Sequence, residues 1–246
     1  MAETAAAGGG ARTRRMSRTV DGRTYHCSVP VNAQHAAPLP LIVAVHGKGD
    51  NGLDFLIGTD LGQAEAIIAA PTGRGLAWSP APYAVSTVEE DSAFIEAIIA
   101  DLSQAYPVDP ARIYLAGFSN GGGLVAELAV NNPEQYAAVA TVAGAIRTEL
   151  ESIAAGAPVD YLNIHGTWDD VVPYAGQDRG SLGLIHAAEA VVDAFTRRNG
   201  ADKQATARTT HIAVTAMGHE WPAGVWARDG FDATKEILEF FGIEAS

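Results

Sequence analysis

The chain alternates short, continuously apolar runs with longer stretches of mixed polarity. The clearest apolar runs cover residues 41–45 and 66–70. Runs of this length without polar alternation are typical of strands buried on both faces of a parallel sheet. Four later segments, less uniformly apolar, are also predicted as strands: residues 112–116, 137–142, 161–164 and 205–214. The pattern therefore predicts a mostly parallel sheet.

Between these runs, apolar residues recur at helical spacing. Ser86 begins an S-x-x-E pattern with Glu89, which is a capping box and predicts a helix over 86–104. Further helices are predicted over 121–130, 182–198 and 232–241, with a weaker pattern over 55–65 that glycines interrupt. Strands that alternate with helices predict an α/β domain with helices on both faces of its sheet.

The N-terminal part differs from this pattern. Two strand-like runs flank Asp21-Gly22, which is typical of a tight hairpin turn, so we expect an antiparallel N-terminal edge. Residues 1–16 are small, polar and basic, and we expect a flexible tail followed by one domain over 17–246. The tail lacks the run of about 7–15 apolar residues of a signal peptide. This favours a cytoplasmic location, with export without a recognisable leader left open.

Composition excludes several classes of protein. The 246 residues carry a net charge of −13, which argues against a nucleic-acid partner. A single cysteine excludes an intrachain disulfide and a Cys-rich zinc site. No run approaches the roughly 18 apolar residues of a membrane helix, so no membrane partner is expected. We also expect no metal and no cofactor.

Residues 117–121 read G-F-S-N-G, a G-x-S-x-G motif between a predicted strand and a predicted helix. In this context a sharp turn lifts the serine hydroxyl above the sheet edge. The helix N-terminus behind the serine favours a developing negative charge. Ser119 is therefore the candidate nucleophile; the alternative is a glycine-rich turn with a capping serine.

A serine nucleophile needs a base, and the base needs an orienting acid. Asp169 and Asp170 follow the predicted strand 161–164, and His219 follows the strand 205–214. Both loops are expected at the same sheet edge as Ser119, where ligands of parallel sheets bind. We expect His219 as the base and Asp169 as the acid, with Asp170 as the alternative acid.

A competing interpretation places a metal at His165, Asp169 and Asp170. No H-x-x-x-H pattern or second nearby histidine supports it. His46 and His165 each precede a glycine at a strand end, and we expect them to shape their turns.

An oxyanion hole is expected from two backbone N–H groups, those of Asn120 and Lys48. Lys48 is one of three lysines in the chain and lies in the loop after the first buried strand. Its side chain could pair with a carboxylate or phenolate of the substrate. The alternative is a solvated lysine paired with Asp50.

Taken together, the motifs VAVHGKGDN, YPVDPARIYLAGFSNGG, YAAVATVAGA, HGTWDDVVPY and GHEWP resemble one family. The chain resembles the α/β-hydrolase esterases grouped with polyhydroxybutyrate depolymerases and feruloyl esterases. The resemblance implies an α/β-hydrolase fold and hydrolysis of carboxylic esters through an acyl-serine intermediate. It maps the triad of the family onto Ser119, Asp169 and His219.

The segment over 145–159 is too short for a helical cap, and no large lid is expected after strand 161–164. This predicts an open cleft for bulky small-molecule or oligomeric esters, aromatic or hydroxyalkanoate. Trp78, Trp168 and Trp221 fall in strand-end loops and are expected to contact the substrate, whereas Trp226 is expected to pack locally. Alternative functions are a thioesterase or lactonase and a non-catalytic ligand-binding protein on a hydrolase fold.

Overall fold

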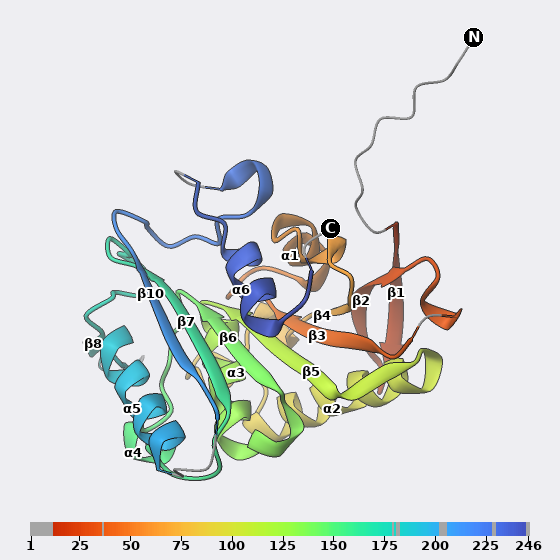
Figure 1. Cartoon of the computed structure of the whole chain (residues 1–246). Helices are drawn as coiled ribbons and strands as arrows, with labels where there is room; N and C mark the ends of the chain where they lie inside the picture. The colour runs from red at the N-terminus through yellow and green to blue at the C-terminus, as the bar shows by residue number, and fades with distance from the viewer. Residues whose placement is uncertain are drawn as a thin grey trace.

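A mixed sheet of eight strands runs through the middle of the molecule in the order β1-β2-β4-β3-β5-β6-β7-β10 (Figure 1). The computed structural model describes residues 12–35, 37–178, 180, 183–201, 206–227 and 230–244. Neighbours from β4 to β10 are parallel, and β2 pairs antiparallel with β1 and β4. The strands are β1 Thr13–Val20, β2 Arg23–Pro30, β3 Leu39–Val45, β4 Ile67–Pro71, β5 Val108–Phe118, β6 Ala138–Val142, β7 Asp160–Gly166 and β10 Thr209–Val214. The predicted parallel sheet with an antiparallel N-terminal edge is confirmed.

Helices cover both faces of this sheet. The main ones are α1 Gly52–Gly58, α2 Val88–Ala105, α3 Asn120–Asn131, α5 Ala188–Gly200 and α6 Ala233–Phe241. On β3, Leu41 and Val43 pack with the apolar sides of α2, α3 and α5, whereas Ile42 and Ala44 pack with α1 and α6. This alternation follows from the two-residue period of a strand, and it explains why the run is apolar throughout.

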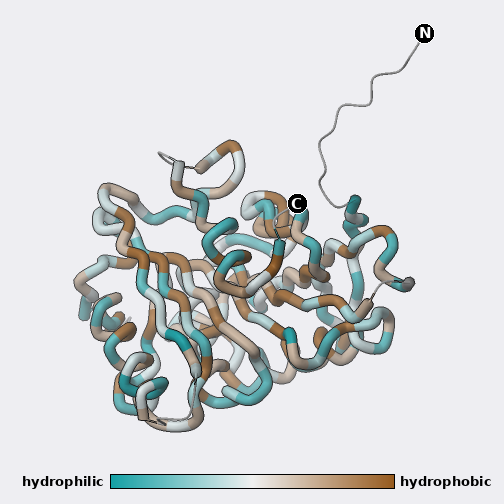
Figure 2. The backbone as a smooth tube through the Cα atoms, viewed as in Figure 1, coloured by the Kyte–Doolittle hydropathy of each residue, from teal (hydrophilic) through white to brown (hydrophobic). Residues whose placement is uncertain are grey.

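The distribution of polarity agrees with two buried layers. Figure 2 shows hydrophobic strands in the interior and hydrophilic segments in the surrounding helices and loops. Within the described part of the chain, no helix combines the length and the hydropathy needed to span a membrane.

The N-terminal boundary differs from the expected one. The turn at Asp21-Gly22 is formed as predicted, with both residues at positive φ. However, β1 begins at Thr13, four residues before the expected start of the domain at residue 17. The polarity of these residues did not predict a strand, because β1 is an edge strand whose side chains are partly exposed. The backbone of every residue in β1 nevertheless pairs with β2, from Thr13 opposite Pro30 onward. The expected tail otherwise falls on residues 1–11, outside the described residues, and on Arg12.

The start of α2 is shifted by one residue from the predicted capping box. Thr87, not Ser86, is the N-cap; its side chain accepts from the Glu90 N–H while the Glu90 carboxylate accepts from the Thr87 N–H. The sequence contains both frames, S-x-x-E and T-x-x-E. The second frame forms because the Ser86 hydroxyl donates to Asp91 Oδ2 at 2.8 Å.

Two segments near the sheet edge are less regular than expected. The helix predicted over 182–198 begins only at Ala188, where α5 starts; residues 181 and 182 lie outside the described residues. Before it, β8 Gln177–Asp178 and β9 Leu184–Ile185 form a small antiparallel hairpin. The weak helix pattern over 55–65 corresponds to α1 and a short 3-10 turn, Leu61–Gln63.

Candidate active site

Ser119 occupies a strained turn between β5 and α3. Its backbone has φ 52° and ψ −117°, a conformation that an L-residue adopts only when its surroundings enforce it. The neighbouring glycines permit the turn, because a Cβ on Gly117 would lie 2.5 Å from Gly121 O and one on Gly121 would lie 2.3 Å from Val45 O. The serine N–H donates to Val142 O at 3.0 Å, which anchors the turn to β6.

The serine, the histidine and the aspartate form one hydrogen-bonded chain. The Ser119 hydroxyl donates to His219 Nε2 at 2.9 Å, and His219 Nδ1–H donates to Asp169 Oδ2 at 2.7 Å. These three residues come from loops that are far apart in sequence but follow β5, β7 and β10. The alternative acid, Asp170, is exposed, so the structure places Asp169 and not Asp170 against the imidazole.

Asp169 is buried and surrounded by hydrogen-bond donors. Its Oδ1 accepts the N–H groups of Val171 and Val172 at 2.9 and 2.7 Å, and His165 Nε2 lies 3.4 Å from Oδ2. Burial opposes ionisation, but the hydrogen bonds from His165, His219 and Val172 outweigh it and hold the pKa of Asp169 well below its usual range. The carboxylate is therefore charged and positioned to stabilise a protonated imidazole.

Backbone contacts tie the acid loop to the base loop. The N–H groups of Thr167 and Trp168 donate to Val214 O and Met217 O, each at 3.0 Å. The His219 ring also packs against Phe118, with ring centroids 4.9 Å apart. The loop after β7 and the Phe118 ring thus set the position of the imidazole.

A second network links the loops after β3, β4 and β5. The Asn120 side chain accepts from Trp78 N–H at 2.7 Å and donates to Trp78 O at 2.9 Å. The Trp78 indole N–H donates to His46 O at 3.1 Å, and Gly73 N–H donates to His46 Nε2 at 3.0 Å. Burial lowers the pKa of His46, in keeping with a neutral ring that accepts at Nε2.

This network frames the two backbone groups expected to form an oxyanion hole. Asn120 is the first residue of α3, directly after the serine, and Lys48 lies in the loop that the His46 network holds. Two further hydrogen bonds hold that loop: the Gly49 N–H donates to Leu76 O, and the Asp50 N–H donates to Gly47 O. Both N–H groups stay candidates for oxyanion donors.

The three tryptophans expected at the substrate have different environments. Trp78 is fully buried, so the expectation that it contacts substrate is wrong: its indole and backbone hold the network around Asn120. Trp221 is half-buried, donates to Thr234 Oγ1 and packs edge-on against Phe55. Trp168 is 72% exposed beside Asp169 and stays a candidate substrate contact. Trp226, expected to pack locally, is 75% exposed.

A cavity of about 200 Å³ opens at the serine. Its lining includes Ser119, the cations Lys48 and Arg147 with Tyr83, and the apolar side chains Ala145, Val171, Val172 and Ile185. Ile185 belongs to the hairpin before α5, so the segment after β7 contributes to the lining of the cleft. The described residues between β7 and α5 form no α-helix.

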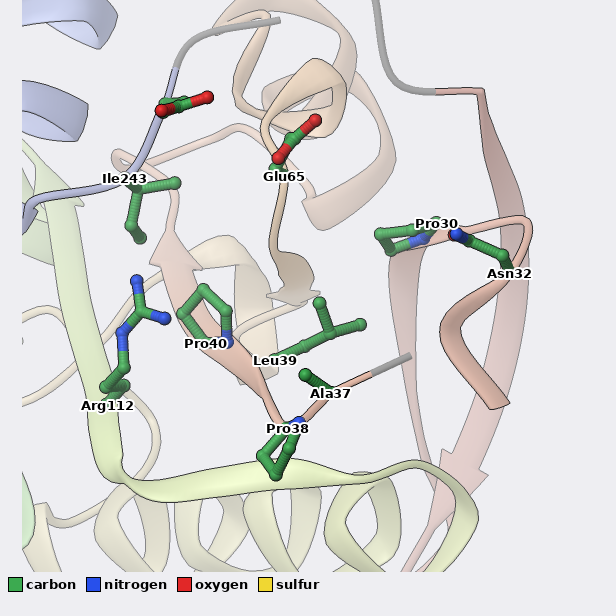
Figure 3. Close-up of a pocket in the computed structure, with 10 residues that line it drawn as sticks. Pro30, Asn32, Ala37, Pro38, Leu39, Pro40, Glu65, Arg112 and Ile243 are labelled. Carbon is green, nitrogen blue, oxygen red and sulfur yellow. The ribbon is translucent and has the colours of Figure 1, made fainter. Parts of the chain in front are cut away.

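A larger hollow, of about 350 Å³, lies at the opposite end of the sheet (Figure 3). Its lining residues Leu39 and Pro40 begin β3, whereas His46 follows the end of that strand. Arg112 likewise lies on β5 before the segment that leads to Ser119. This hollow is therefore separate from the serine site.

His165 hydrogen-bonds its own loop as expected, with Nε2 2.8 Å from Val172 O. Sequence reasoning missed three side chains that shape the site: the amide of Asn120, and Tyr83 and Arg147 in the cavity lining. Arg147 follows β6, as Ser119 follows β5, so the rule that strand-end loops carry function could have found it. The contacts of Asn120 with Trp78 link residues 42 positions apart and leave no local pattern.

Comparison with known proteins gives consistent similarities. A phospholipase/carboxylesterase family model matches residues 80–196. The chain is 29% identical over 230 residues to a protein named as the esterase NocK of Nocardia uniformis, covering 76% of this chain and 67% of the relative. It is 30% identical over 166 residues to feruloyl esterase C of Emericella nidulans, covering 64% of this chain and 58% of the relative.

A solved structure, that of esterase PE8, superposes with a TM-score of 0.60 at 26% identity. The match covers 85% of this chain and 95% of that structure. The chain spans little more than half of the length of feruloyl esterase C. These similarities bear out the resemblance to α/β-hydrolase esterases that the motifs indicated.

Proposed function

We propose that this chain, which has the α/β-hydrolase fold expected from its sequence, is a serine hydrolase of carboxylic esters. The observation that carries the proposal is the hydrogen-bonded chain from Ser119 through His219 to Asp169. Its esterase relatives support the same reaction class. In this proposal Ser119 is the nucleophile, His219 the general base and Asp169 the group that orients and stabilises the imidazolium.

The mechanism follows from the hydrogen bonds. His219 Nε2 takes the Ser119 proton as Oγ attacks the ester carbonyl, and the protonated ring then returns that proton to the leaving alcohol. The N–H groups of Asn120 and Lys48 stabilise the oxyanion. Water, deprotonated by His219, releases the acid from the acyl-serine in the second half of the cycle.

The cleft supports esters with a bulky or aromatic part. Apolar side chains of Ala145, Val172 and Ile185 line the cavity beside Ser119, and Trp168 lies exposed next to the acid. Feruloyl esterases are among the relatives, so hydroxycinnamoyl esters belong in the substrate class proposed here. The motif resemblance to polyhydroxybutyrate depolymerases adds 3-hydroxyalkanoate esters to it.

The experiment that tests this function combines labelling with a substrate panel. A fluorophosphonate probe should label the wild type and leave Ser119→Ala unlabelled. The wild type should hydrolyse p-nitrophenyl, hydroxycinnamoyl or 3-hydroxybutyrate esters, and Ser119→Ala should lose that activity. A chain that is neither labelled nor active on these esters would be a binding protein instead, and a preference for thioesters or lactones would move it to those classes.

For the cellular location we propose the cytoplasm. The lone cysteine supports this proposal, because secreted domains more often carry disulfides. Cys27 is buried, and burial raises the pKa of its thiol to about 11, so the reduced form is protected. Fractionation of cells that produce the native chain, followed by immunoblotting, would test the location.

A further inference from the structure

Two cations face the same aromatic ring at the opening of the serine cavity. Lys48 Nζ lies 4.2 Å and Arg147 Cζ 5.7 Å from the centroid of the Tyr83 ring. The three residues come from the loops after β3, β4 and β6, and all three line the cavity that contains Ser119. The fold thus brings two positive charges from separate loops into the lining of the cavity that contains Ser119.

The side chains of these residues are held toward the cavity. Arg147 Nη1 donates to Ala145 O at 3.1 Å, which ties the guanidinium to a residue of the cavity lining. Lys48 packs on Tyr83, whereas the neighbouring Asp50 accepts the N–H of Asn51. Lys48 is exposed, as the alternative of a solvated lysine expected, but its ammonium contacts the Tyr83 ring rather than Asp50.

The cavity also has an apolar part. Ala145, Val172 and Ile185 form a small buried cluster of their own, separate from the two main cores. No carboxylate is among the described residues that line the cavity, and Asp169 of the triad is engaged by His219 and by the N–H groups of Val171 and Val172. The cavity therefore offers a ligand both apolar and cationic contacts.

The two cations lie in a chain whose net charge is strongly negative. A net charge of −13 repels anions from most of the surface, so a pair of cations at the opening creates a local exception. Two like charges that share one ring also repel each other, and a bound anion relieves that repulsion. An Arg beside a Lys suits a carboxylate, because the guanidinium can donate two parallel hydrogen bonds.

We propose that Lys48 and Arg147 form an anion subsite, and that the preferred esters carry a carboxylate joined to the scissile ester by an apolar spacer. This inference rests on the proposed function and narrows its substrate class. The apolar spacer would lie on Ala145, Val172 and Ile185, and the carboxylate would lie between the two cations beside Tyr83. The ester carbonyl would then lie at Ser119.

The test compares matched pairs of esters that differ only in the charge. One pair carries the carboxylate on the acyl side: the 4-methylumbelliferyl half-ester of glutaric acid and its glutaramate analogue. The other carries it on the alcohol side: 4-(butanoyloxy)benzoate and the corresponding benzamide. The quantity measured is the ratio of kcat/KM for the carboxylate to that for the amide, in the wild type, Arg147→Met, Arg147→Lys and Lys48→Met.

In at least one pair, Arg147→Met should lower this ratio about tenfold or more, as expected for loss of a charge-assisted hydrogen bond. Arg147→Lys should retain most of the preference, and Lys48→Met should lower it. The matched control is Arg197→Met. It removes an exposed arginine of α5 that lies 3.8 Å from the Glu151 carboxylate, and it should leave the ratio unchanged. High salt should lower the ratio of the wild type.

If the neutral esters are hydrolysed and Arg147→Met leaves both ratios within about twofold of the wild type, the anion subsite is wrong while the proposed function stands. If no ester is hydrolysed, the proposed function fails and binding becomes the test. Calorimetry would then compare ethyl hydrogen glutarate and 4-hydroxybenzoate on the wild type and on Arg147→Met. Equal binding to both proteins, or binding to neither, overturns the subsite.

Discussion

The side chain of Asn120 closes a two-hydrogen-bond ring with the backbone of Trp78, at 2.7 and 2.9 Å, although 42 residues separate the two. The ring joins the start of α3, directly after Ser119, to the loop after β4. Trp78 in turn donates to His46 O at the end of β3. The Asn120 amide and the Trp78 indole therefore join three loops of the site.

Replacing this amide should weaken both stability and activity. Asn120→Ala leaves the buried N–H and C=O of Trp78 without partners, so we expect a loss of about 2–4 kcal/mol in the free energy of unfolding. The displaced loop should also lower kcat. Chemical denaturation and ester kinetics measure the two effects.

Two further variants make this test specific. Asn120→Asp can still accept from Trp78 N–H but cannot donate to Trp78 O, so its stability should fall between those of Asn120→Ala and the wild type. Asn131→Ala, on the same helix, removes an exposed side chain that donates to Glu127 and should cost less than about 0.5 kcal/mol. A cost as large at residue 131 as at residue 120 would contradict the role of the ring.

The two neighbouring aspartates should behave differently. Asp169→Asn removes the charge that faces His219 Nδ1–H and permits the wrong tautomer of the ring, so kcat should fall by roughly 10⁴. Asp170→Asn changes an exposed side chain and should leave kcat close to that of the wild type. Steady-state kinetics on the best ester of the panel measure both. Equal losses would show that the acid is not Asp169 alone.

His46 should contribute to the loss of stability in mild acid. Burial lowers its pKa in the folded chain below the ordinary value of about 6.5. The unfolded chain therefore binds the proton more readily, and the contribution is complete above about pH 6.5 and declines as pH falls toward the folded pKa. The slope from this residue cannot exceed about 1.4 kcal/mol per pH unit.

Comparison of wild type and His46→Gln by denaturation at several pH values would check this slope. Burial also lowers the pKa of His186 and His211, so the variant should lose part of the slope and retain the rest. An unchanged pH dependence in His46→Gln would rule out a neutral, buried His46 as its source.

Asp91 should be the most sensitive carboxylate of α2. Its Oδ2 accepts from the N–H and hydroxyl of Ser79 and from the hydroxyl of Ser86, and Oδ1 lies 3.6 Å from Arg23 Nη2. Asp91→Ala leaves the mostly buried guanidinium of Arg23 without this counter-charge, which should cost about 3–5 kcal/mol. Thermal or chemical denaturation measures the loss.

Glu89 provides the control for this prediction, because it lies in the same first turn of α2 but is exposed. Glu89→Ala should have a much smaller effect than Asp91→Ala. Comparable effects would mean that helix electrostatics, and not the buried contacts of Asp91, account for the loss.

The sequence by itself determined the order of strands and helices and the residues that follow each strand. Continuous apolar runs of this length are typical of strands buried on both faces, and parallel strands bring their carboxyl ends to one edge. That was sufficient to select Ser119, Asp169 and His219 as one constellation, which the structure brings within hydrogen-bond distance. The sequence did not decide between two overlapping capping boxes at the start of α2, one beginning at Ser86 and the other at Thr87.

Only the tertiary structure decided which polar side chains face one another. Trp78 is of a residue type and in a strand-end loop that suggest a substrate contact. In the structure it is fully buried, because Asn120 and His46 lie against it. Arg147 joins Lys48 on the Tyr83 ring across loops that no local pattern relates. Hydrophobic periodicity records which face of an element is buried, whereas contacts between distant loops depend on how the elements pack.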